Sequence, residues 1–234
     1  MIYALHGNLG SPRDWEALDL PGLQAIDLWE WQERFPGISL EEFGEAFSEE
    51  VAASGDPEPV LLGYSLGGRL ALQALAARRD FWKGAMLIST HPGLTDETEK
   101  NSRRESDREW ARRVREMPWT GFLESWNAQG VLANQPAPGG QGALEDRREA
   151  VARAFDSWSL GRQDAAEERL GTLDVPLLAV TGEQDEKFAD LAERFRNCGD
   201  RVAVTVMPNC GHRIPMEAPD RLAEVIREWR ARVK

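Results

Sequence analysis

The chain is poor in the residues that disulfide and metal chemistry require. It has two cysteines, Cys198 and Cys210, and neither a Cys-x-x-Cys nor a His-x-x-x-His spacing, so we expect no disulfide framework and no metal site. No apolar run reaches the roughly 18 residues that a membrane-spanning helix needs. The segment from Met1 to Leu5 is typical of a buried strand, not of a signal sequence. These absences predict a protein of the reducing cytoplasm, with no cofactor and with two inert thiols.

Positive charge is also scarce. The 28 lysines and arginines are outnumbered by 40 acidic residues, and the net charge of −12 argues against nucleic acid or anionic membranes as partners. The imbalance is uneven, because between Thr95 and Gln163 we count 11 basic and 12 acidic residues. Most of these arginines are expected to form ion pairs on solvated helices. If the substrate is an anion, however, the positive potential that attracts it must come from this segment.

Short apolar runs alternate with helical patterns along most of the chain. A length of 234 residues with 41% hydrophobic residues suits one α/β domain with an insertion. Strands are predicted at Ile2–Leu5, Leu23–Asp27, Val60–Gly63, Ala85–Ser89, Leu177–Thr181 and Val202–Met207. Helices are predicted at Asp14–Leu18, Ser39–Ser54, Leu66–Arg78, Phe188–Asn197 and Asp220–Val233. This alternation predicts an α/β fold with a mostly parallel, doubly wound sheet and helices on both faces.

The alternation stops at about Thr95 and resumes at about Gly171. Between them lie four of the nine tryptophans, and Trp110, Val114 and Met117 follow a helical spacing. The segment is too rich in tryptophan to be a disordered linker. We therefore expect a sheet core of residues 1–94 and 171–234, interrupted by a helical cap of residues 95–170.

The pattern Gly-x-Ser-x-Gly around Ser65 follows a predicted strand and opens a predicted helix. In this nucleophile-elbow arrangement a serine is held on a sharp strand-to-helix turn. Glycines at positions 63 and 67 allow the strand and helix backbones to approach each other closely. The pattern predicts that Ser65 is the reactive group.

A serine hydroxyl needs a neighbouring base, and the partners in this fold follow in the order serine, acid, histidine. Of the three histidines, only His212 lies far enough toward the C-terminus, in a loop after the last predicted strand. Asp185 follows the preceding strand and is predicted to orient the imidazole. Glu183 is the nearby alternative for the acid.

An oxyanion hole is expected from two backbone N–H groups. One belongs to Leu66, which follows the serine at the start of a helix. The other is predicted at Asn8, in the loop after the first strand, where Gly7 permits close approach. His6 is expected to brace this loop and not to take part in catalysis.

Arg69 lies four residues after Ser65 and therefore on the same side of the following helix. It is surrounded in sequence by apolar residues, and a buried arginine is costly without an anionic partner. Two interpretations remain open: an ion pair with a core carboxylate, or a bidentate grip on a substrate carboxylate.

Together these motifs resemble the 2-succinyl-6-hydroxy-2,4-cyclohexadiene-1-carboxylate synthase family of menaquinone biosynthesis, within the α/β-hydrolase superfamily. The matching segments span nearly the whole chain. They are Leu5-His-Gly-Asn-Leu-Gly-Ser11, Gly63-Tyr-Ser-Leu-Gly-Gly-Arg69, His91-Pro-Gly-Leu94, Arg103-Arg-Glu-Ser-Asp-Arg-Glu-Trp110, Phe122-Leu-Glu-Ser-Trp126, Gly182-Glu-Gln-Asp-Glu-Lys-Phe188 and Gly211-His212.

The resemblance implies a carbon–oxygen lyase that eliminates pyruvate from a polycarboxylate. In this family the triad removes a proton, so Ser65 polarised by His212 would act as a base and form no acyl-enzyme. The resemblance also implies substrate contacts from Tyr64, Arg69, Arg103 and Trp126. A further cap arginine is expected, and because the spacing here is shortened, Arg147, Arg148 or Arg153 could serve, with Arg148 our choice.

Two other functions remain open. The same triad could hydrolyse small carboxylesters or carbon–carbon bonds through an acyl-enzyme. A binding protein that has kept the fold without activity is disfavoured by the intact Ser65, Asp185 and His212. In either enzymatic case we expect a small anionic substrate and a monomer or weak homo-oligomer.

Overall fold

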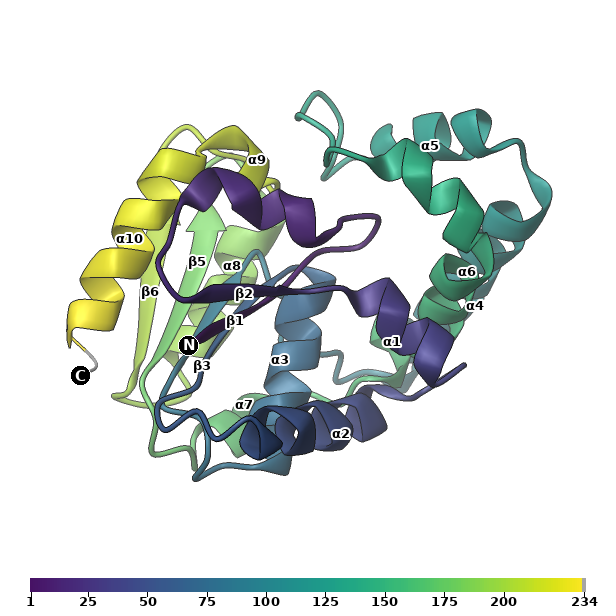
Figure 1. The fold of residues 1–234 in the computed structure, drawn as a ribbon. Coiled ribbons are helices and arrows are strands. Elements are labelled where there is room, and N and C mark those ends of the chain that lie inside the picture. The colour runs from purple at the N-terminus through teal and green to yellow at the C-terminus, as the bar shows by residue number, and fades with distance from the viewer. Residues whose placement is uncertain (233–234) are drawn as a thin grey trace.

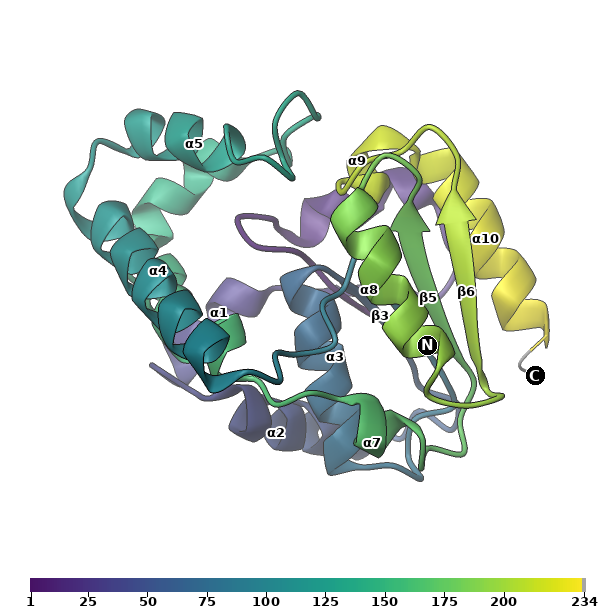
Figure 2. The same ribbon diagram turned by 180° about the vertical axis from the view of Figure 1, so that it is seen from behind.

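The computed structural model describes residues 1–232, folded around a sheet of six strands (Figures 1 and 2). All neighbouring strands pair in parallel, in the order β2-β1-β3-β4-β5-β6, which confirms the expected sheet. The predicted strands differ from the observed ones by at most one residue at an end. The strands are β1 (Ile2–Leu5), β2 (Leu23–Ile26), β3 (Val60–Tyr64), β4 (Ala85–Ile88), β5 (Leu177–Gly182) and β6 (Val202–Met207).

Successive residues of the strands face opposite sides of the sheet and build two apolar cores. Leu61 belongs to the first core and Leu62 to the second. The first core is covered by α2 (Leu40–Ala53), α3 (Leu66–Ala77) and α8 (Glu186–Arg196). The second core is covered by the 3₁₀ helix η1 (Pro12–Leu18), α9 (Ile214–Glu217) and α10 (Pro219–Arg232). Helices on both faces were expected from the alternating sequence.

Some helices were not predicted. The helix α1 (Leu28–Arg34) begins after Asp27, whose carboxylate accepts hydrogen bonds from the backbone N–H of Trp29 (2.9 Å) and Glu30 (3.3 Å). The single-turn helices α7 (Glu167–Leu170) and α9 were also not predicted. The predicted final helix corresponds to α10, and its last residue, Val233, lies outside the described residues.

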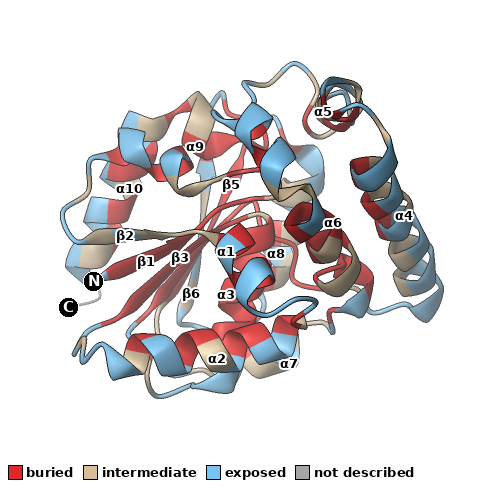
Figure 3. Ribbon diagram, turned by 45° about the vertical axis from the view of Figure 1, so that its right-hand side comes forward, coloured by how far each residue is buried: buried red, intermediate tan, exposed pale blue. Residues whose placement is uncertain are grey.

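Residues 97–162 form a helical segment without strands, between β4 and β5. It comprises α4 (Glu97–Glu116), α5 (Trp119–Asn127), η2 (Gln141–Arg147), α6 (Arg148–Ser157) and η3 (Leu160–Arg162). Its helices stand beside the sheet (Figure 3). They pack around their own aromatic cluster of Trp110, Phe122, Trp126 and Phe155. A parallel bridge between Leu94 and Asp164 joins its two ends. Within residues 1–232, no helix is both long and apolar enough to cross a membrane.

Candidate active site

Ser65 occupies the turn between β3 and α3 in a strained backbone conformation, with φ 52° and ψ −109°. Its N–H donates to the carbonyl of Ile88 (2.9 Å), which ties the turn to β4. Two glycines make this turn possible. A Cβ at Gly67 would lie 2.0 Å from the carbonyl oxygen of Leu5, and one at Gly63 would lie 2.5 Å from the Cα of Gly68. The two glycines therefore allow the neighbouring backbones to pack closely. Ser65 lies at the C-terminal ends of the strands as a result.

The structure brings Ser65, His212 and Asp185 into one hydrogen-bonded chain. The Nδ1–H of His212 donates to Oδ2 of Asp185 (2.7 Å), and the Ser65 hydroxyl lies 3.2 Å from His212 Nε2. The other carboxylate oxygen of Asp185 accepts from the N–H of Phe188 (3.4 Å), at the start of α8. The centre of the Phe188 ring lies 4.4 Å from the centre of the imidazole, so the two rings are in contact. Glu183, the alternative acid, instead accepts from the N–H of Asn209 (2.9 Å).

Asn8 and Leu66, the expected oxyanion-hole residues, both lie beside Ser65 at the wall of a cavity. Asn8 belongs to the loop that follows β1, and His6 braces that loop. The Nδ1–H of His6 donates to the carbonyl of Gly7 (2.8 Å), and its Nε2 accepts from the N–H of Leu28 (3.1 Å). Burial lowers the pKa of His6 to about 4, so the ring is neutral and can make both bonds. His6 is thus structural, as its position in the sequence suggested.

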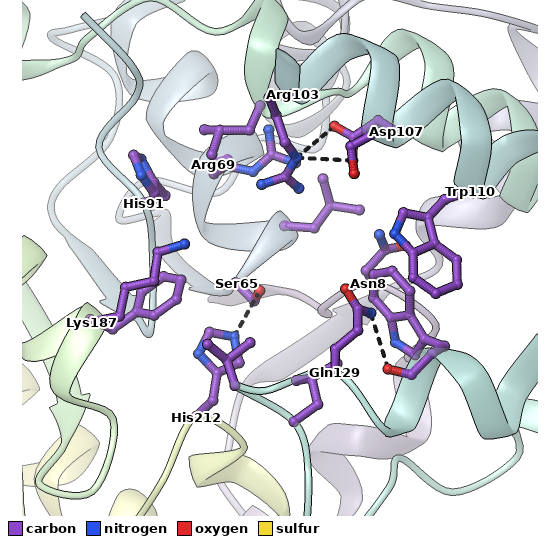
Figure 4. Close-up of a pocket in the computed structure, with 17 residues that line it drawn as sticks. Asn8, Ser65, Arg69, His91, Arg103, Asp107, Trp110, Gln129, Lys187 and His212 are labelled. Atoms are coloured by element: carbon purple, nitrogen blue, oxygen red, sulfur yellow. Dashed lines mark hydrogen bonds and ion pairs between the residues drawn. The ribbon is translucent and has the colours of Figure 1, made fainter. Parts of the chain in front are cut away.

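The cavity has a volume of about 250 Å³ and lies between the sheet and the helical segment (Figure 4). The sheet side contributes the carboxyl ends of the strands, and the helical segment contributes α4, α5 and the loop that follows α5. The lining residues are Asn8, Ser65, Leu66, Arg69, His91, Arg103, Ser106, Asp107, Trp110, Trp126, Gln129, Val131, Leu132, Leu160, Lys187, Phe188 and His212. A cavity built in this way can hold a small molecule against Ser65.

Arg69 reaches the cavity from the first turn of α3 and is 8% exposed. Its guanidinium donates to the carbonyl of Trp158 (2.8 Å) and to the side-chain oxygen of Gln163 (3.3 Å), both neutral acceptors. No carboxylate within residues 1–232 pairs with it. Burial, together with the nearby charge of Arg103, lowers the pKa of Arg69. Of the two interpretations, a direct ion pair with a core carboxylate is therefore ruled out among the described residues. The charge of Arg69 is favoured only at longer range by Asp107, which Arg103 already holds.

Arg103 approaches from α4 and is held by a carboxylate on the same helix. Its Nε donates to both oxygens of Asp107 (3.0 and 2.9 Å), and Asp107 also accepts from the Ser159 hydroxyl (2.7 Å). Asp107 is only 3% exposed, whereas the Arg103 side chain is 38% exposed. The remaining N–H groups of Arg103 are thus available to a molecule in the cavity, beside Arg69 (Figure 4).

Two aromatic residues were expected to contact the substrate, and only one of them lines the cavity. Trp126 does so, with its ring 5.2 Å from that of Trp110. Tyr64 does not, because its ring fills the space over Gly7 and lies 5.7 Å from the His212 ring. Tyr64 therefore packs behind the histidine.

The three candidate cap arginines all lie away from the cavity. Arg148 donates to the carbonyls of Arg115 and Met117 and pairs with Glu145, so our choice of Arg148 as a cavity residue was wrong. The other two are also engaged elsewhere. Arg147 pairs with Asp27 and Glu33, and Arg153 lies 3.8 Å from Glu149. The physical reason is that acidic residues of α1, η2 and α6 neutralise this side of the helical segment.

Reasoning from the residues had not assigned a role to His91 or Lys187, which also line the cavity. The His91 Nδ1 accepts from the N–H of Gly93 (3.0 Å), and burial lowers the pKa of the ring to about 3, so His91 is neutral. Lys187 was part of the segment Gly182–Phe188 that matched the family, but no role was predicted for it. Among residues 1–232, no cluster of three or more His, Cys, Asp or Glu side chains could hold a metal ion.

The chain matches known proteins along almost its entire length. The family model of the alpha/beta hydrolase family matches residues 3–225. A 2-succinyl-6-hydroxy-2,4-cyclohexadiene-1-carboxylate synthase of Serratia proteamaculans (strain 568) is 30% identical, over 96% of this chain and 91% of that protein. The enzyme of the same name from Yersinia pestis (strain Pestoides F) is 33% identical, over 82% of this chain and 75% of that protein.

Solved structures agree on the fold. MenH from S. aureus superposes with a TM-score of 0.86 at 24% identity, covering 99% of this chain and 93% of that chain. The malate-bound thermophilic esterase of Thermogutta terrifontis gives a TM-score of 0.74 at 22% identity, covering 99% and 89%. The family resemblance expected from the motifs is confirmed. The chain belongs to the alpha/beta hydrolase family and, within it, to the family of 2-succinyl-6-hydroxy-2,4-cyclohexadiene-1-carboxylate synthases.

Proposed function

We propose that this protein is itself a 2-succinyl-6-hydroxy-2,4-cyclohexadiene-1-carboxylate synthase, a lyase that eliminates pyruvate from a polycarboxylate. The observation that carries the proposal is Arg69, a buried guanidinium above Ser65 with no carboxylate partner among the described residues. A buried charge of this kind is costly unless an anion compensates it. In a protein of net charge −12, an arginine in this position favours a substrate that brings its own carboxylates.

In the proposed reaction Ser65 is the base. His212 Nε2 takes the hydroxyl proton, and the Ser65 oxygen removes a proton from an acidic carbon of the substrate. The electron pair of that C–H bond forms a conjugated carbanion and then a carbon–carbon double bond. The bond between the ring carbon and the enolpyruvyl oxygen breaks, and the departing enolate is protonated to pyruvate by the proton that His212 holds, which restores the neutral triad. Atoms balance without a cofactor, and Asp185 stabilises the imidazolium that forms on the way.

The remaining residues would stabilise charge and position the substrate. Asn8 and Leu66 line the cavity beside Ser65, and their N–H groups would donate to the substrate oxygen on which negative charge develops. Arg69 and Arg103 would bind substrate carboxylates, with Asp107 holding Arg103 in place. The helical segment would act as the cap that keeps water from the carbanion, and Trp126 would form part of its inner wall.

The test is a measurement of pyruvate release from the pathway intermediate, coupled to NADH oxidation by lactate dehydrogenase. We expect saturable release by the wild-type protein. Ser65→Ala should reduce kcat by about 10²–10⁴-fold, the usual contribution of a positioned base. Unchanged activity in Ser65→Ala would contradict the whole catalytic scheme.

A hydrolase that uses the same triad is the second candidate. It is favoured by the 3.2 Å contact between the Ser65 hydroxyl and His212 Nε2, next to Asn8 and Leu66, because this geometry also suits attack on an ester carbonyl. A hydrolase would turn over a neutral nitrophenyl ester rapidly and would accumulate an acyl-enzyme that mass spectrometry detects on Ser65. Rapid ester turnover without pyruvate release would reject the lyase.

We further propose that the protein acts in the cytoplasm on a small anionic molecule, as a monomer or weak homo-oligomer, with neither nucleic acid nor a membrane as partner. The net charge of −12 supports this choice of partner.

A further inference from the structure

Lys187 lies in the first turn of α8, two residues after Asp185, and lines the cavity. Figure 4 shows its ammonium group turned into the cavity, on the side where His91 and Arg69 lie. The charge of Lys187 reaches the interior of the site. After burial, it is the largest contribution that lowers the pKa of His91.

The stability of the fold does not explain why a lysine stands at this position. Among residues 1–232, Lys187 has no acidic partner within ion-pair distance, whereas Lys100 pairs with both Glu97 and Asp164. A lysine in the first turn of a helix is also unfavourable, since the N-terminus of the helix dipole is positive. Its nearest aromatic contact, the Phe188 ring at 5.9 Å, is loose. An unpaired cation in an unfavourable place at a cavity wall points to a ligand that supplies the missing charge.

The chemistry of the proposed reaction requires one more cation than the two arginines provide. The name of the product specifies two carboxylates, one on the succinyl chain and one on the ring, and the pyruvate that leaves carries a third. Arg69 and Arg103 can each bind one. The expected cap arginine is absent from the cavity, because Arg147 and Arg148 are bound elsewhere.

We propose that Lys187 binds the third carboxylate of the substrate. The inference rests on the proposed lyase function. The cavity then carries three cations against the single carboxylate of Asp107, which Arg103 already holds. Because Lys187 contacts only substrate, it is a binding residue whose loss should act mainly on KM.

The experiment compares Lys187→Gln with Lys187→Arg and Lys83→Gln in the pyruvate-release assay. Lys83 and Lys187 are both exposed, so the two glutamine variants lose the same charge. Lys83 precedes the N-terminal end of β4, whereas Ser65 lies at the C-terminal ends of the strands. We expect Lys187→Gln to lower kcat/KM about tenfold, mostly through KM, the low end for a hydrogen bond to a charged group. Lys187→Arg should retain most of the activity, and Lys83→Gln should match the wild type.

Thermal unfolding separates binding from a structural role. Removing a cation from the start of α8 should leave Tm unchanged or slightly raised, so the loss of activity cannot come from unfolding. If Lys187→Gln and Lys83→Gln have the same KM while the wild type releases pyruvate, the assignment of Lys187 is wrong and the lyase function stands. If the wild type releases no pyruvate, the function is wrong and the assignment falls with it.

Discussion

Arg69 shows how a single residue can carry information about a ligand. Most arginines of this chain satisfy their charge locally, as Arg112 does with Glu109 and Glu116. Among residues 1–232, the hydrogen-bond partners of the Arg69 side chain are instead a carbonyl oxygen, that of Trp158, and the amide oxygen of Gln163. The fold thus bears the cost of a buried, unpaired charge, and a substrate carboxylate would remove that cost.

We expect Arg69→Ala to reduce kcat/KM for the polycarboxylate about 100-fold, because a charge-assisted bidentate contact is lost. Arg69→Lys should recover only part of it, since an ammonium cannot bind in the same fork geometry. Steady-state pyruvate release gives these values. A neutral nitrophenyl ester, assayed on the same preparations, serves as the control and should lose far less. Equal losses on both substrates would contradict the role of Arg69 as a carboxylate receptor.

The sequence predicted the residues around Ser65 better than those of the helical segment, and the reason is geometric. Ser65, Asp185 and His212 each follow a strand, and parallel strands bring their carboxyl ends together whatever lies between them. The position of Arg148 is not constrained in this way, because its neighbours depend on how α4 and α6 pack against each other. Lys187 stood in a segment that matched the family, but its position near the start of a helix did not predict that its side chain points into the cavity.

At the scale of the elements, the loop that follows α5 makes direct contact with the segment that carries His212. The side-chain oxygen of Gln135 accepts from the N–H of Arg213 (2.9 Å), and a Cβ at Gly211 would lie 2.4 Å from the Gln135 amide nitrogen. The Arg213 guanidinium in turn donates to the carbonyls of Gln135 and Pro136, both at 3.3 Å, and to the side chain of Asn127. These hydrogen bonds therefore connect the helical segment to the loop that carries His212.

Loss of the hydrogen bonds between Gln135 and Arg213 should displace His212. We expect Gln135→Ala to lower kcat about fivefold to tenfold with a small change in KM, because a backbone hydrogen bond next to His212 is lost. Gln24→Ala on the exposed face of β2 is the matched control and should be silent. Pyruvate-release kinetics at saturating substrate measure the effect. A change confined to KM would show that the loop acts on substrate binding and does not position the histidine.

Strands and helices were predictable where the pattern of apolar residues determines their position and type. The six strands are short apolar runs, and the sequence located each to within one residue. The helix α1 was missed because its seven residues contain Trp29 and Trp31 and too few turns for a periodic pattern. The cap residue Asp27 was the one local signal for its start.

At the scale of the whole molecule, acidic residues outnumber basic ones, and Asp14 is one of the few that are buried. Asp14 is 8% exposed, its Oδ2 accepts from the N–H of Ser11 (3.2 Å), and its other oxygen has no partner. Burial raises the pKa of Asp14 to about 7, far above the ordinary value of 3.8. The folded state therefore binds a proton that the unfolded state releases between these two values, so stability falls as the pH rises from about 4 to 7.

Replacing this carboxyl by an amide should remove that pH dependence. We expect Asp14→Asn to gain about 1–2 kcal/mol of unfolding free energy relative to wild type between pH 5 and pH 8. Chemical denaturation at pH 5 and pH 8 gives the unfolding free energy of both proteins. A packing cost of the asparagine is the same at both pH values, so it cancels when the change with pH is compared between the proteins. Parallel pH profiles for the two proteins would mean that Asp14 does not titrate in this range.

The bridge between Leu94 and Asp164 has an evolutionary consequence. It places the two points where the chain leaves and rejoins the sheet side by side, between the neighbouring strands β4 and β5. Residues 97–162 are thus one continuous insertion, which can be exchanged without altering the order of the strands. A replacement that keeps a contact equivalent to that between Gln135 and Arg213 could change the substrate through a single stretch of coding sequence, while Ser65, Asp185 and His212 stay on the sheet.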